Sequence, residues 1–489
     1  MRQVRYALRT LSRTPGFALS VILTLGLGIG ANTAVFSAID AVLLRSLPFP
    51  DGDQLVQVGQ RRDRSSETLL APVRLEDWHA SNATFEVITG YYTEDISETS
   101  GELPERVRRA MVAPRFFDLW QVAPARGRTF TPDEYRFGGP RAVIVSNRYW
   151  RVRFAADPNI LDRTLRIGNA RYAIVAVMPA SFLFLDRNVD VWFPVPTDAP
   201  YAQSREGGWY TAIGRLKNGV TLEQARADLR AVQGTLGDRY GGPDREIRPE
   251  IVPLKDAMVA RARSSLWLLF AAVTVLLLIT CTNVAALFLS RGVNRRREIG
   301  IRISLGSSRG AIVAQTLIET LLLALAGGAL GLLASAAAAR GFRVMAAGLP
   351  RADEIALDTW ILLYTLGCAI GVTLLSGLIP AVRSTRIGAA EILASAGGAR
   401  STARLTAHWV LVGVQVTLAS VLLSGAGVLL RSLQELGRVN PGFDPSRVLT
   451  FHISATFNEW GDMPRLTRRI DATLDALGAL PDVEAAATT

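Results

Sequence analysis

The sequence predicts an α-helical, multi-pass membrane protein with a large α/β (α+β) domain inserted after the first span. Two observations lead to this fold class. Apolar residues make up 49% of the 489 residues, and many of them gather in five runs without charge that are long enough for transmembrane helices. Between the first and second runs lies segment 45–263, which is charged and has the alternating patterns of a folded domain.

The first apolar run, residues 15–44, is predicted to be a membrane anchor. No charged residue lies between Arg13 and Asp40, so the run exceeds the roughly 20 residues that an α-helix needs to cross a bilayer. It is also far longer than the roughly 7–15 apolar residues of a signal peptide, although cleavage near residues 31–37 is an alternative. The other predicted spans are 264–290, 316–339, 359–382 and 405–430.

Residues 1–14 are expected to form a short cytoplasmic amphipathic helix. Val4, Leu8 and Leu11 have helical spacing, and arginines lie on a roughly opposite face. Such a helix lies among lipid headgroups. The alternative, ordinary flanking charge, explains the arginines but not the apolar spacing.

The placement of arginine predicts the topology, because arginines near the ends of a span stay in the cytoplasm. Four arginines precede the first span, and residues 291–309 contain six arginines but only one acid, Glu298. The loop between the third and fourth spans contains both arginines and acidic residues. We therefore expect a cytoplasmic N-terminus, a cytoplasmic loop 291–309 and an outside domain 45–263. The net charge of +11 follows mainly from this topology, so no nucleic-acid partner is expected.

The outside segment 45–263 is expected to fold as a soluble α/β domain. Alternating apolar residues predict strands at 54–58, 142–146 and 173–177, and an amphipathic helix is predicted from Thr221 to Leu236. The tryptophans of this segment are expected mostly in its core, with a ligand platform as the alternative. The four tryptophans considered for this choice are Trp120, Trp150, Trp192 and Trp209.

An internal repeat links the first and fifth spans. Residues 41–47 and 427–433 match at six of seven positions, at an offset of 386. We therefore interpret 405–430 as the start of a second unit and 431–489 as the truncated beginning of a second outside domain.

Several classes of enzyme are excluded by composition. The two lysines, Lys217 and Lys255, are followed by Asn218 and Asp256, so neither completes a Walker A motif in these residues. Three histidines form no H-E-x-x-H motif, and we expect no metal, no other cofactor and no enzymatic activity. A hydrolase that uses His79 with the acidic pairs 76–77 or 133–134 is a weaker alternative.

Three sets of motifs resemble those of MacB-like and FtsX-like ABC-transporter permeases, especially the duplicated "orphan" permeases of acidobacteria. Residues 15–17 and 28–45 resemble the first span of that family, and residues 295–309 through Gln315 and Glu319 resemble its cytoplasmic loop. Residues 114–117, 127–130, 148–150 and 176–179 resemble the MacB-type periplasmic core. The resemblance covers essentially the whole chain. Asp162 and Ser46 depart from the usual glycine and proline, and we interpret both as local turn changes.

Loop 291–309 is predicted to couple the permease to an ATPase. Glu298 and Arg302 have i, i+4 spacing on a short helix that Gly306 would end. The alternative is a solvated loop that only obeys the charge rule. The resemblance implies contact with a cytoplasmic nucleotide-binding subunit through Arg296, Glu298, Arg302, Gly306 and Arg309. Glu319 is expected at the cytoplasmic entry of the third span, paired with an arginine of this loop.

Pairs of glycines within the spans predict close contacts between helices. They are Gly26 with Gly30, Gly327 with Gly331, and Gly367 with Gly371, each at the small-xxx-small spacing. Gly26, Gly28 and Ala31 also match a dinucleotide fingerprint, but no strand precedes them, so we reject that interpretation. Asn32 and Asn283 are expected to form interhelical hydrogen bonds, with a substrate contact as the alternative.

The sequence thus predicts the permease subunit of an ABC-type transporter in a bacterial inner membrane. The resemblance assigns 45–263 to a MacB-like periplasmic core and 264–400 to an FtsX-like permease domain, moved by a separate cytoplasmic ATPase. Expected partners are that ATPase in trans, membrane lipids, a periplasmic partner, and a second permease unit supplied by internal duplication or a homodimer. The alternative is an ATPase-independent, membrane-anchored periplasmic binding or scaffold protein, which has no need of the coupling loop.

Overall fold

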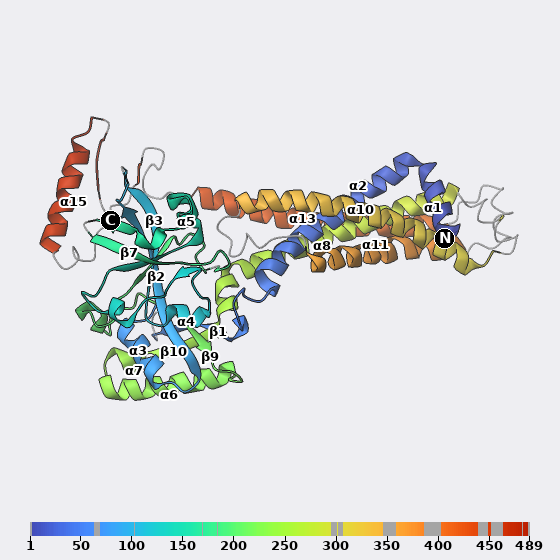
Figure 1. Ribbon diagram of the computed structural model, residues 1–489. Coiled ribbons are helices and arrows are strands. Elements are labelled where there is room, and N and C mark those ends of the chain that lie inside the picture. Colours follow the sequence, from blue (N-terminus) through green and yellow to red (C-terminus); the bar gives the residue numbers. More distant parts are fainter. Residues whose placement is uncertain are drawn as a thin grey trace. The chain divides into compact units, whose positions relative to one another are not determined.

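The chain forms two compact units in the computed structural model (Figure 1). The helical unit comprises Met1–Arg45 and Met258–Phe443, and the sheet unit comprises Ser46–Ala257 and Asp444–Thr489. The structure describes residues 2–62, 69–101, 103–168, 170–182, 184–294, 301, 307–345, 358–385, 402–438, 448–450, 463–481 and 483–487.

Within its described residues, the helical unit contains five helices long and apolar enough to cross a membrane, in the stretches Pro15–Leu44, Ala262–Arg291, Arg309–Ala337, Thr359–Leu378 and Trp409–Glu435. Pro15 stands in the first turn of its helix, where no backbone N–H is needed. The helices of this unit are α1 (Arg2–Ser12), α2 (Pro15–Ile39), a π-helical turn (Asp40–Leu44), α8 (Leu254–Asn294), α10 (Arg309–Met345), α11 (Thr359–Thr385) and α13 (Thr402–Gly437).

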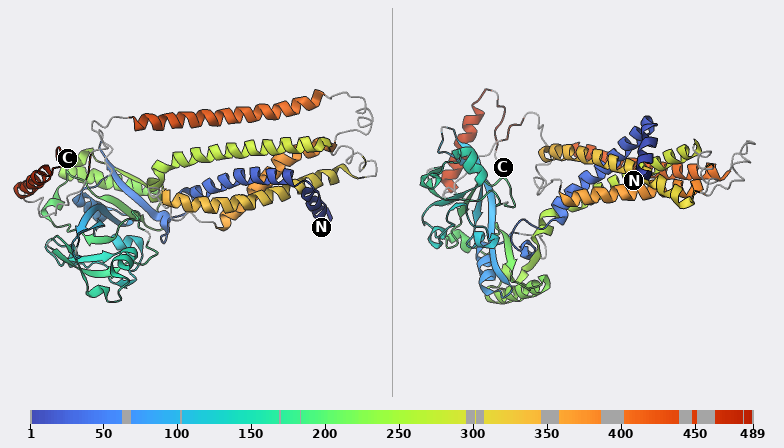
Figure 2. Two further views of the ribbon diagram at one scale, coloured as in Figure 1. Left: turned by 90° about the horizontal axis from the view of Figure 1, so that it is seen from above. Right: turned by 45° about the vertical axis from the view of Figure 1, so that its right-hand side comes forward.

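Five of these helices, α1, α2, α8, α10 and α11, share one apolar core. Leu25 and Ile29 of α2 pack with Val284 of α8, Leu323 of α10 and Ala369 of α11. Figure 2 shows α2, in blue, running along α10, in gold. The window Trp409–Glu435 of α13 has no buried residue, so α13 adds nothing to this core. Five apolar helices and the domain described next confirm the predicted fold class.

The sheet unit is built on one ten-stranded mixed sheet. The main strand order is β10-β1-β9-β2-β3-β8-β5-β7-β4, and β6 pairs with β2 and β7. The pairs β3–β8 and β5–β7 are parallel, and the others are antiparallel. The strands are β1 (Leu55–Arg61), β2 (Phe85–Glu98), β3 (Glu105–Val112), β4 (Arg126–Gly127), β5 (Ala142–Val145), β6 (Thr164–Ile167), β7 (Ala170–Val177), β8 (Val191–Pro194), β9 (Thr211–Leu216) and β10 (Arg248–Pro253).

Helices cover this sheet and close two separate apolar cores. Trp78 of α3 and Leu229 of α6 pack on the β10-β1-β9-β2 part, whereas Tyr149 of α5 packs on β5, β7 and β8. The helices of the sheet unit are α3 (Pro72–Ser81), α4 (Phe116–Trp120), α5 (Asn147–Phe154), α6 (Leu222–Tyr240), α7 (Pro243–Glu246) and α15 (Met463–Gly478). Short 3-10 turns occupy Gly52–Gln54, Pro132–Tyr135, Ile160–Asp162 and Pro200–Gln203.

The local predictions for this domain agree with the structure. The strands expected at 54–58, 142–146 and 173–177 are present in β1, β5 and β7. Helix α6 begins after Thr221, whose hydroxyl accepts a hydrogen bond from the Gln224 backbone in a capping box. Trp120 and Trp192 are buried and both contact the ring of Phe182, while Trp150 and Trp209 are half-buried.

Candidate functional site

The predicted coupling loop lies mostly outside the described residues. Arg296, Glu298, Arg302 and Gly306 all fall there, so their predicted roles stay predictions. The structure describes the two helices that border this loop. Helix α8 ends at Asn294, and α10 begins at the exposed residue Arg309. The hydroxyl of Ser308 accepts a hydrogen bond from the Ala311 backbone (3.2 Å), which caps the start of α10.

Arg291 ties the end of α8 to the start of the chain. Its Nη2 donates to the Thr14 hydroxyl (2.8 Å) and to the Thr10 carbonyl (3.4 Å), and its guanidinium lies 4.4 Å from the centre of the Phe17 ring. The junction between α1 and α2 is therefore held to the last turn of α8, three residues before the described part of α8 ends.

Glu319 lies buried within α10, ten residues after its start. At 1.5 Å per residue this places it about 15 Å along the helix. One of its oxygens accepts a hydrogen bond from Nε2 of Gln315, one turn earlier (3.1 Å). The predicted pairing of Glu319 with an arginine of loop 291–309 stays a prediction, since most of that loop lies outside the described residues.

Two of the predicted glycine pairs face each other across one helix crossing. A Cβ added to Gly30 of α2 would lie 2.8 Å from Cα of Gly331 on α10, and one added to Gly331 would lie 2.7 Å from the Gly30 nitrogen. Gly26 and Gly327 approach in the same way one turn earlier. The two backbones are thus in direct contact, which only residues without a side chain permit. We call these four residues the glycine seam.

The third glycine pair has different surroundings. A Cβ added to Gly367 or Gly371 of α11 would meet nothing within 4 Å in the described part of the chain, so the close contact expected there is not formed. Two other glycines make close contacts that the spacing rule did not single out. Gly28 faces the side chain of Thr280 on α8, and Gly377 of α11 faces Thr320 on α10.

Three polar side chains, those of Asn32, Thr274 and Tyr364, form hydrogen bonds across the helical unit next to the glycine seam. We call these three residues the polar belt. The Asn32 amide donates to the Thr274 hydroxyl of α8 (3.2 Å), and its carbonyl accepts from the Tyr364 hydroxyl of α11. The Tyr364 ring stacks on Phe36, with ring centres 3.8 Å apart. Asn32 is almost fully buried, so its interhelical hydrogen bonds join three helices where lone polar groups would be costly.

An ion-pair cluster lies at the other end of α2 from α1. The Arg45 guanidinium donates to Asp40 through Nε (3.1 Å) and Nη2 (2.9 Å), and Nη2 also contacts the carboxylate of Asp358. The second oxygen of Asp358 accepts from the Ile361 backbone N–H (3.0 Å), which caps α11. One arginine therefore joins the π-helical end of α2 to the start of α11, immediately before the sheet unit begins at Ser46.

The residues considered above for a hydrolase site, His79 and the acidic pairs 76–77 and 133–134, instead form hydrogen bonds and ion pairs within the fold. Burial, and then the nearby charge of Arg115, lower the pKa of His79, whose Nδ1 accepts from the Ile88 backbone (3.3 Å). The adjacent acids pair with arginines: Glu76 with Arg115, Asp77 with Arg205, Asp133 with Arg136 and Glu134 with Arg128. No group of three or more metal-binding side chains occurs in the described ranges.

A buried polar network braces one side of the sheet unit. Arg74, which is fully buried, donates to Asp244 Oδ1 (2.7 Å), to Gln60 Oε1 (2.7 Å) and to the Arg205 carbonyl (3.0 Å). Burial lowers the pKa of Arg74, and the hydrogen bond from its guanidinium to Asp244 opposes this effect. Because every nitrogen of the Arg74 guanidinium has a partner, the buried charge is compensated.

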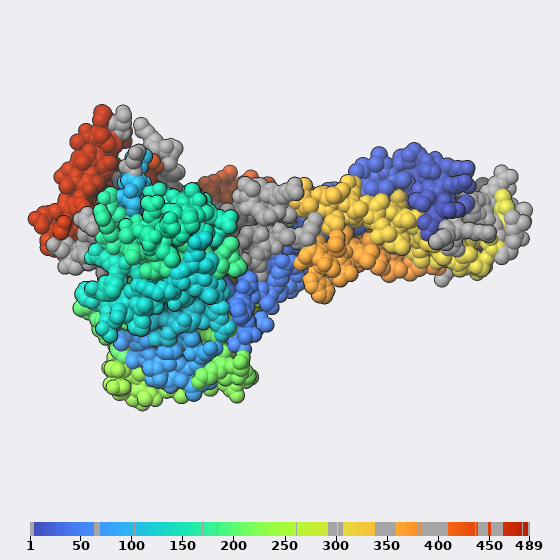
Figure 3. Space-filling model, viewed as in Figure 1, coloured from blue at the N-terminus to red at the C-terminus, as the bar shows by residue number. Residues whose placement is uncertain are grey.

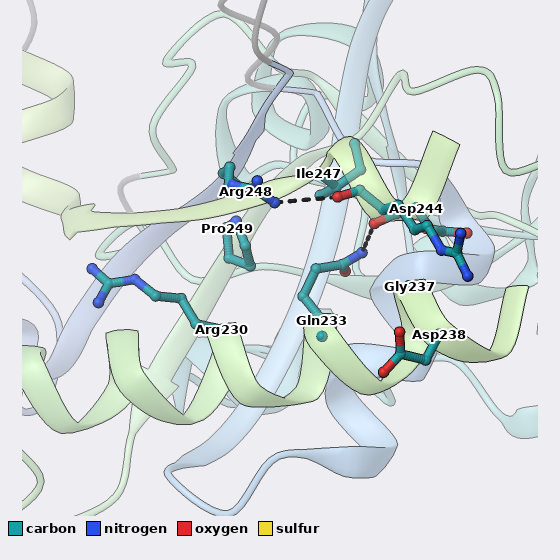
Figure 4. A pocket seen from close by; sticks show the side chains of 10 residues that line it. Arg230, Gln233, Gly237, Asp238, Asp244, Ile247, Arg248 and Pro249 are labelled. Atoms are coloured by element: carbon teal, nitrogen blue, oxygen red, sulfur yellow. Dashed lines mark hydrogen bonds between the residues drawn. The ribbon is translucent and has the colours of Figure 1, made fainter. Parts of the chain in front are cut away.

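A hollow of about 340 Å³ lies on the outer side of this network, between α6, α7 and β10. Figure 4 shows its inner wall, where the Gln233 amide donates to the Asp244 carbonyl (2.7 Å). Arg230 and Asp238 of α6 lie toward opposite ends of the hollow (Figure 4). The inner wall of the hollow thus belongs to the buried network that holds α6 to the sheet, whereas Arg230 and Asp238 are exposed.

Comparison with known proteins assigns a family to both units. Residues 18–232 match the MacB-like periplasmic core domain, and residues 270–389 match the FtsX-like permease C-terminal domain. The chain thus contains a MacB-like periplasmic core domain and an FtsX-like permease domain. With five apolar helices, these domains fit an inner-membrane protein with a periplasmic domain.

Individual relatives of this chain are named as MacB proteins. The macrolide export ATP-binding/permease protein MacB of Burkholderia thailandensis is 26% identical over 418 residues, which cover 80% of this chain and 58% of the relative. The MacB protein of Chromobacterium violaceum is 25% identical over 282 residues, or 57% of this chain and 42% of that one. The permease spans a little over half the length of the first of these relatives.

Comparison with solved structures also gives a match. The periplasmic region of MacB from Actinobacillus actinomycetemcomitans has 12% sequence identity and a TM-score of 0.33, and the match covers 44% of this chain and 94% of that one.

Proposed function

We propose that this permease couples ATP hydrolysis by a separate cytoplasmic ATPase to movement of its periplasmic domain. The observation that carries the proposal is the match to a periplasmic core domain and a permease domain in one chain. The work done by the ATPase would pass through the helices by mechanotransmission, for export or another task in the cell envelope.

The charge distribution supports an orientation with α1 and loop 291–309 in the cytoplasm. Arginines are concentrated at these two places, as expected for segments that stay inside. The ATPase would then dock on loop 291–309 through Arg296, Glu298, Arg302, Gly306 and Arg309. Glu319 would pair with an arginine of this loop and hold it against α10.

The repeated end of α2 and α13 supports a duplicated parent chain of the acidobacterial orphan type. Residues 431–489 would then open a second periplasmic domain, and the second permease unit would come from the same parent chain. If the duplication is not completed, a homodimer supplies that unit. A periplasmic partner completes the set of proposed partners, and the permease itself would catalyse no reaction.

Two features of the described helices support transmission along the chain. Helix α8 follows β10 directly, with Pro253 as the last strand residue and Leu254 as the first helical one, and it continues to the border of the coupling loop. The glycine seam and the polar belt hold α2 to α10, α8 and α11, so a displacement of one helix would be shared by the others.

Co-purification tests this proposal. The full-length parent protein is extracted from its native membrane as wild type and as Glu298→Arg/Arg302→Glu, and bound proteins are identified by mass spectrometry. We expect an ABC-type ATPase subunit with the wild type and a loss of at least tenfold with the loop variant. The matched control is Asp133→Arg/Arg136→Asp, which reverses an exposed ion pair of the sheet unit and should retain the ATPase. Absence of an ATPase from every sample would favour a membrane-anchored binding or scaffold protein.

A further inference from the structure

Helix α1 presents three different surfaces around its axis. At 3.6 residues per turn, Ala7 and Leu11 share one side, Val4 and Leu8 occupy the next, and Arg5 and Arg9 follow beyond them. Ala7 and Leu11 are buried, and Leu11 belongs to the apolar core of the helical unit. The first surface therefore fixes α1 to the bundle and determines where the other two surfaces point.

The second surface of α1 is apolar and uncovered. Val4 is 41% exposed and Leu8 is 53% exposed, although both adjoin the buried side of the same helix. The space-filling view shows the N-terminal segment, in blue, on the surface of the helical unit (Figure 3). An exposed leucine and valine one turn apart, continuous with a membrane-spanning bundle, fit the acyl-chain boundary of a bilayer.

The third surface of α1 is positively charged, and no acidic residue close to it in the sequence neutralises this charge. The first acidic residue of the chain is Asp40, so neither α1 nor the following 27 residues of the sequence supply a carboxylate before it. Arg5, Arg9 and Arg13 are exposed, and none of their guanidinium groups has an ion pair or hydrogen bond in the described part of the protein. Ordinary flanking charge accounts for arginines here, but it does not account for their position beside an exposed apolar strip.

We infer that α1 is a binding site for anionic phospholipid, with Val4 and Leu8 against the acyl chains and Arg5, Arg9 and Arg13 against the headgroup phosphates. The charge of the site selects anionic over zwitterionic lipid, because an arginine near a membrane surface gains about 1 kcal/mol from anionic headgroups. The lipid source is the bilayer that surrounds the protein. The orientation given in the proposed function decides only in which leaflet of the bilayer this lipid lies.

The contacts of Arg291 connect this lipid site to the predicted coupling loop. Arg291 donates to the Thr10 carbonyl in the last turn of α1, where the carbonyl end of the helix favours a cation, and to Thr14 just beyond it. Arg291 also lies over Phe17, and Phe17 packs edge-on against Phe288 of α8 at 5.5 Å. Lipid that holds α1 at the membrane surface therefore also holds the end of α8, where loop 291–309 begins. This second step deepens the proposed function and depends on it.

Lipid retention tests the binding site directly. The full chain is reconstituted in nanodiscs with equal parts of phosphatidylglycerol and phosphatidylcholine, released in the mass spectrometer, and the lipids that stay bound are counted. Wild type should retain phosphatidylglycerol in preference to phosphatidylcholine. In Arg5→Gln/Arg9→Gln this preference should fall about fivefold for each arginine removed. Arg5→Lys/Arg9→Lys keeps both charges and should keep most of the preference.

The controls separate a lipid site from general charge. Arg151→Gln/Arg171→Gln removes two exposed arginines of the sheet unit and should leave retention unchanged. Equal retention of both lipids by wild type, or a preference that survives Arg5→Gln/Arg9→Gln, would overturn the lipid site. Thermal unfolding of each variant identifies any that fail to fold. Because a nanodisc exposes both leaflets and contains no ATPase, this result is independent of the orientation and of the ATPase partner.

Discussion

The residues that follow α2 and those in the last turns of α13 have nearly the same sequence, but the two helices differ in what surrounds them. Residues 41–47 and 427–433 match at six of seven positions, yet 44% of the apolar window in Pro15–Leu44 is buried and none of Trp409–Glu435 is. The difference begins upstream of the shared ends. At the same offset of 386, the three close-contact glycines of α2 (Gly26, Gly28 and Gly30) correspond to Val412, Val414 and Val416.

The polar contacts of α2 are also missing from α13. Asn32, which bonds to α8 and α11, corresponds to Leu418, and Asp40, which pairs with Arg45, corresponds to Ala426. The shared heptapeptide therefore marks where each span ends, whereas the residues before it decide what the span can pack against. Giving α2 the residues of α13, one at a time, measures how much each difference contributes.

The largest effect is expected from Gly30→Val. The added side chain would meet backbone atoms of Gly331 at 2.8–3.0 Å, and backbone cannot move aside as a flexible side chain can. We expect the free energy of unfolding in detergent to fall by about 3 kcal/mol or more, at the upper end of overpacking effects. Gly413→Val in α13 is the matched control, because nothing lies within 4 Å of its added Cβ. Equal losses in both variants would contradict the glycine seam.

A smaller effect is expected from Asn32→Leu. The change removes the bonds to Thr274 and Tyr364 and leaves both hydroxyls without that partner, which should cost about 1–2 kcal/mol in unfolding free energy. Tyr364→Phe should cost less when Asn32 is already leucine than in the wild type, because the two side chains share one hydrogen bond. Strictly additive losses in this double-mutant cycle would show that the bond contributes nothing.

The smallest effect is expected from Asp40→Ala. Arg45 keeps its contact with Asp358, and its side chain is 33% exposed, so we expect a loss of about 0.5–1 kcal/mol that shrinks as salt is added. Asp358→Ala should cost more, since it also removes the cap on the Ile361 N–H. Chemical unfolding at low and high salt measures both. A loss for Asp40→Ala that is independent of salt would argue against an ion pair.

Sequence patterns predicted the structure well where all residues of the pattern lie in one helix. The Thr221 and Gln224 capping box lies within four residues, and α6 begins there. The spacing of Gly26 and Gly30, and of Gly327 and Gly331, indicated contact faces, although it did not show that the two pairs meet each other. The same spacing occurs at Gly367 and Gly371, where no close contact forms, because the rule describes one helix and says nothing of its neighbour.

The contacts that the sequence could not reveal join residues far apart in the chain. Arg45 and Asp358 are 313 residues apart, and Arg74 and Asp244 are 170 apart, so no local pattern relates them. Gly28 and Gly377 lack a second glycine four residues away, and only the facing threonines, Thr280 and Thr320, show why a small residue is needed. Pairing of this kind is decided by how helices and strands pack in three dimensions.

Hydrogen exchange of the complete transporter tests the central claim of ATP-driven transmission most directly. The parent protein is reconstituted with its co-purified ATPase, and exchange is followed by mass spectrometry with ATP and without nucleotide. We predict that ATP changes exchange in residues 40–61 and 248–262, which adjoin two of the three connections between the helical and the sheet unit. Glu298→Arg/Arg302→Glu should abolish the change. Identical exchange in both states, with the ATPase bound and active, would contradict mechanotransmission and favour a static periplasmic scaffold.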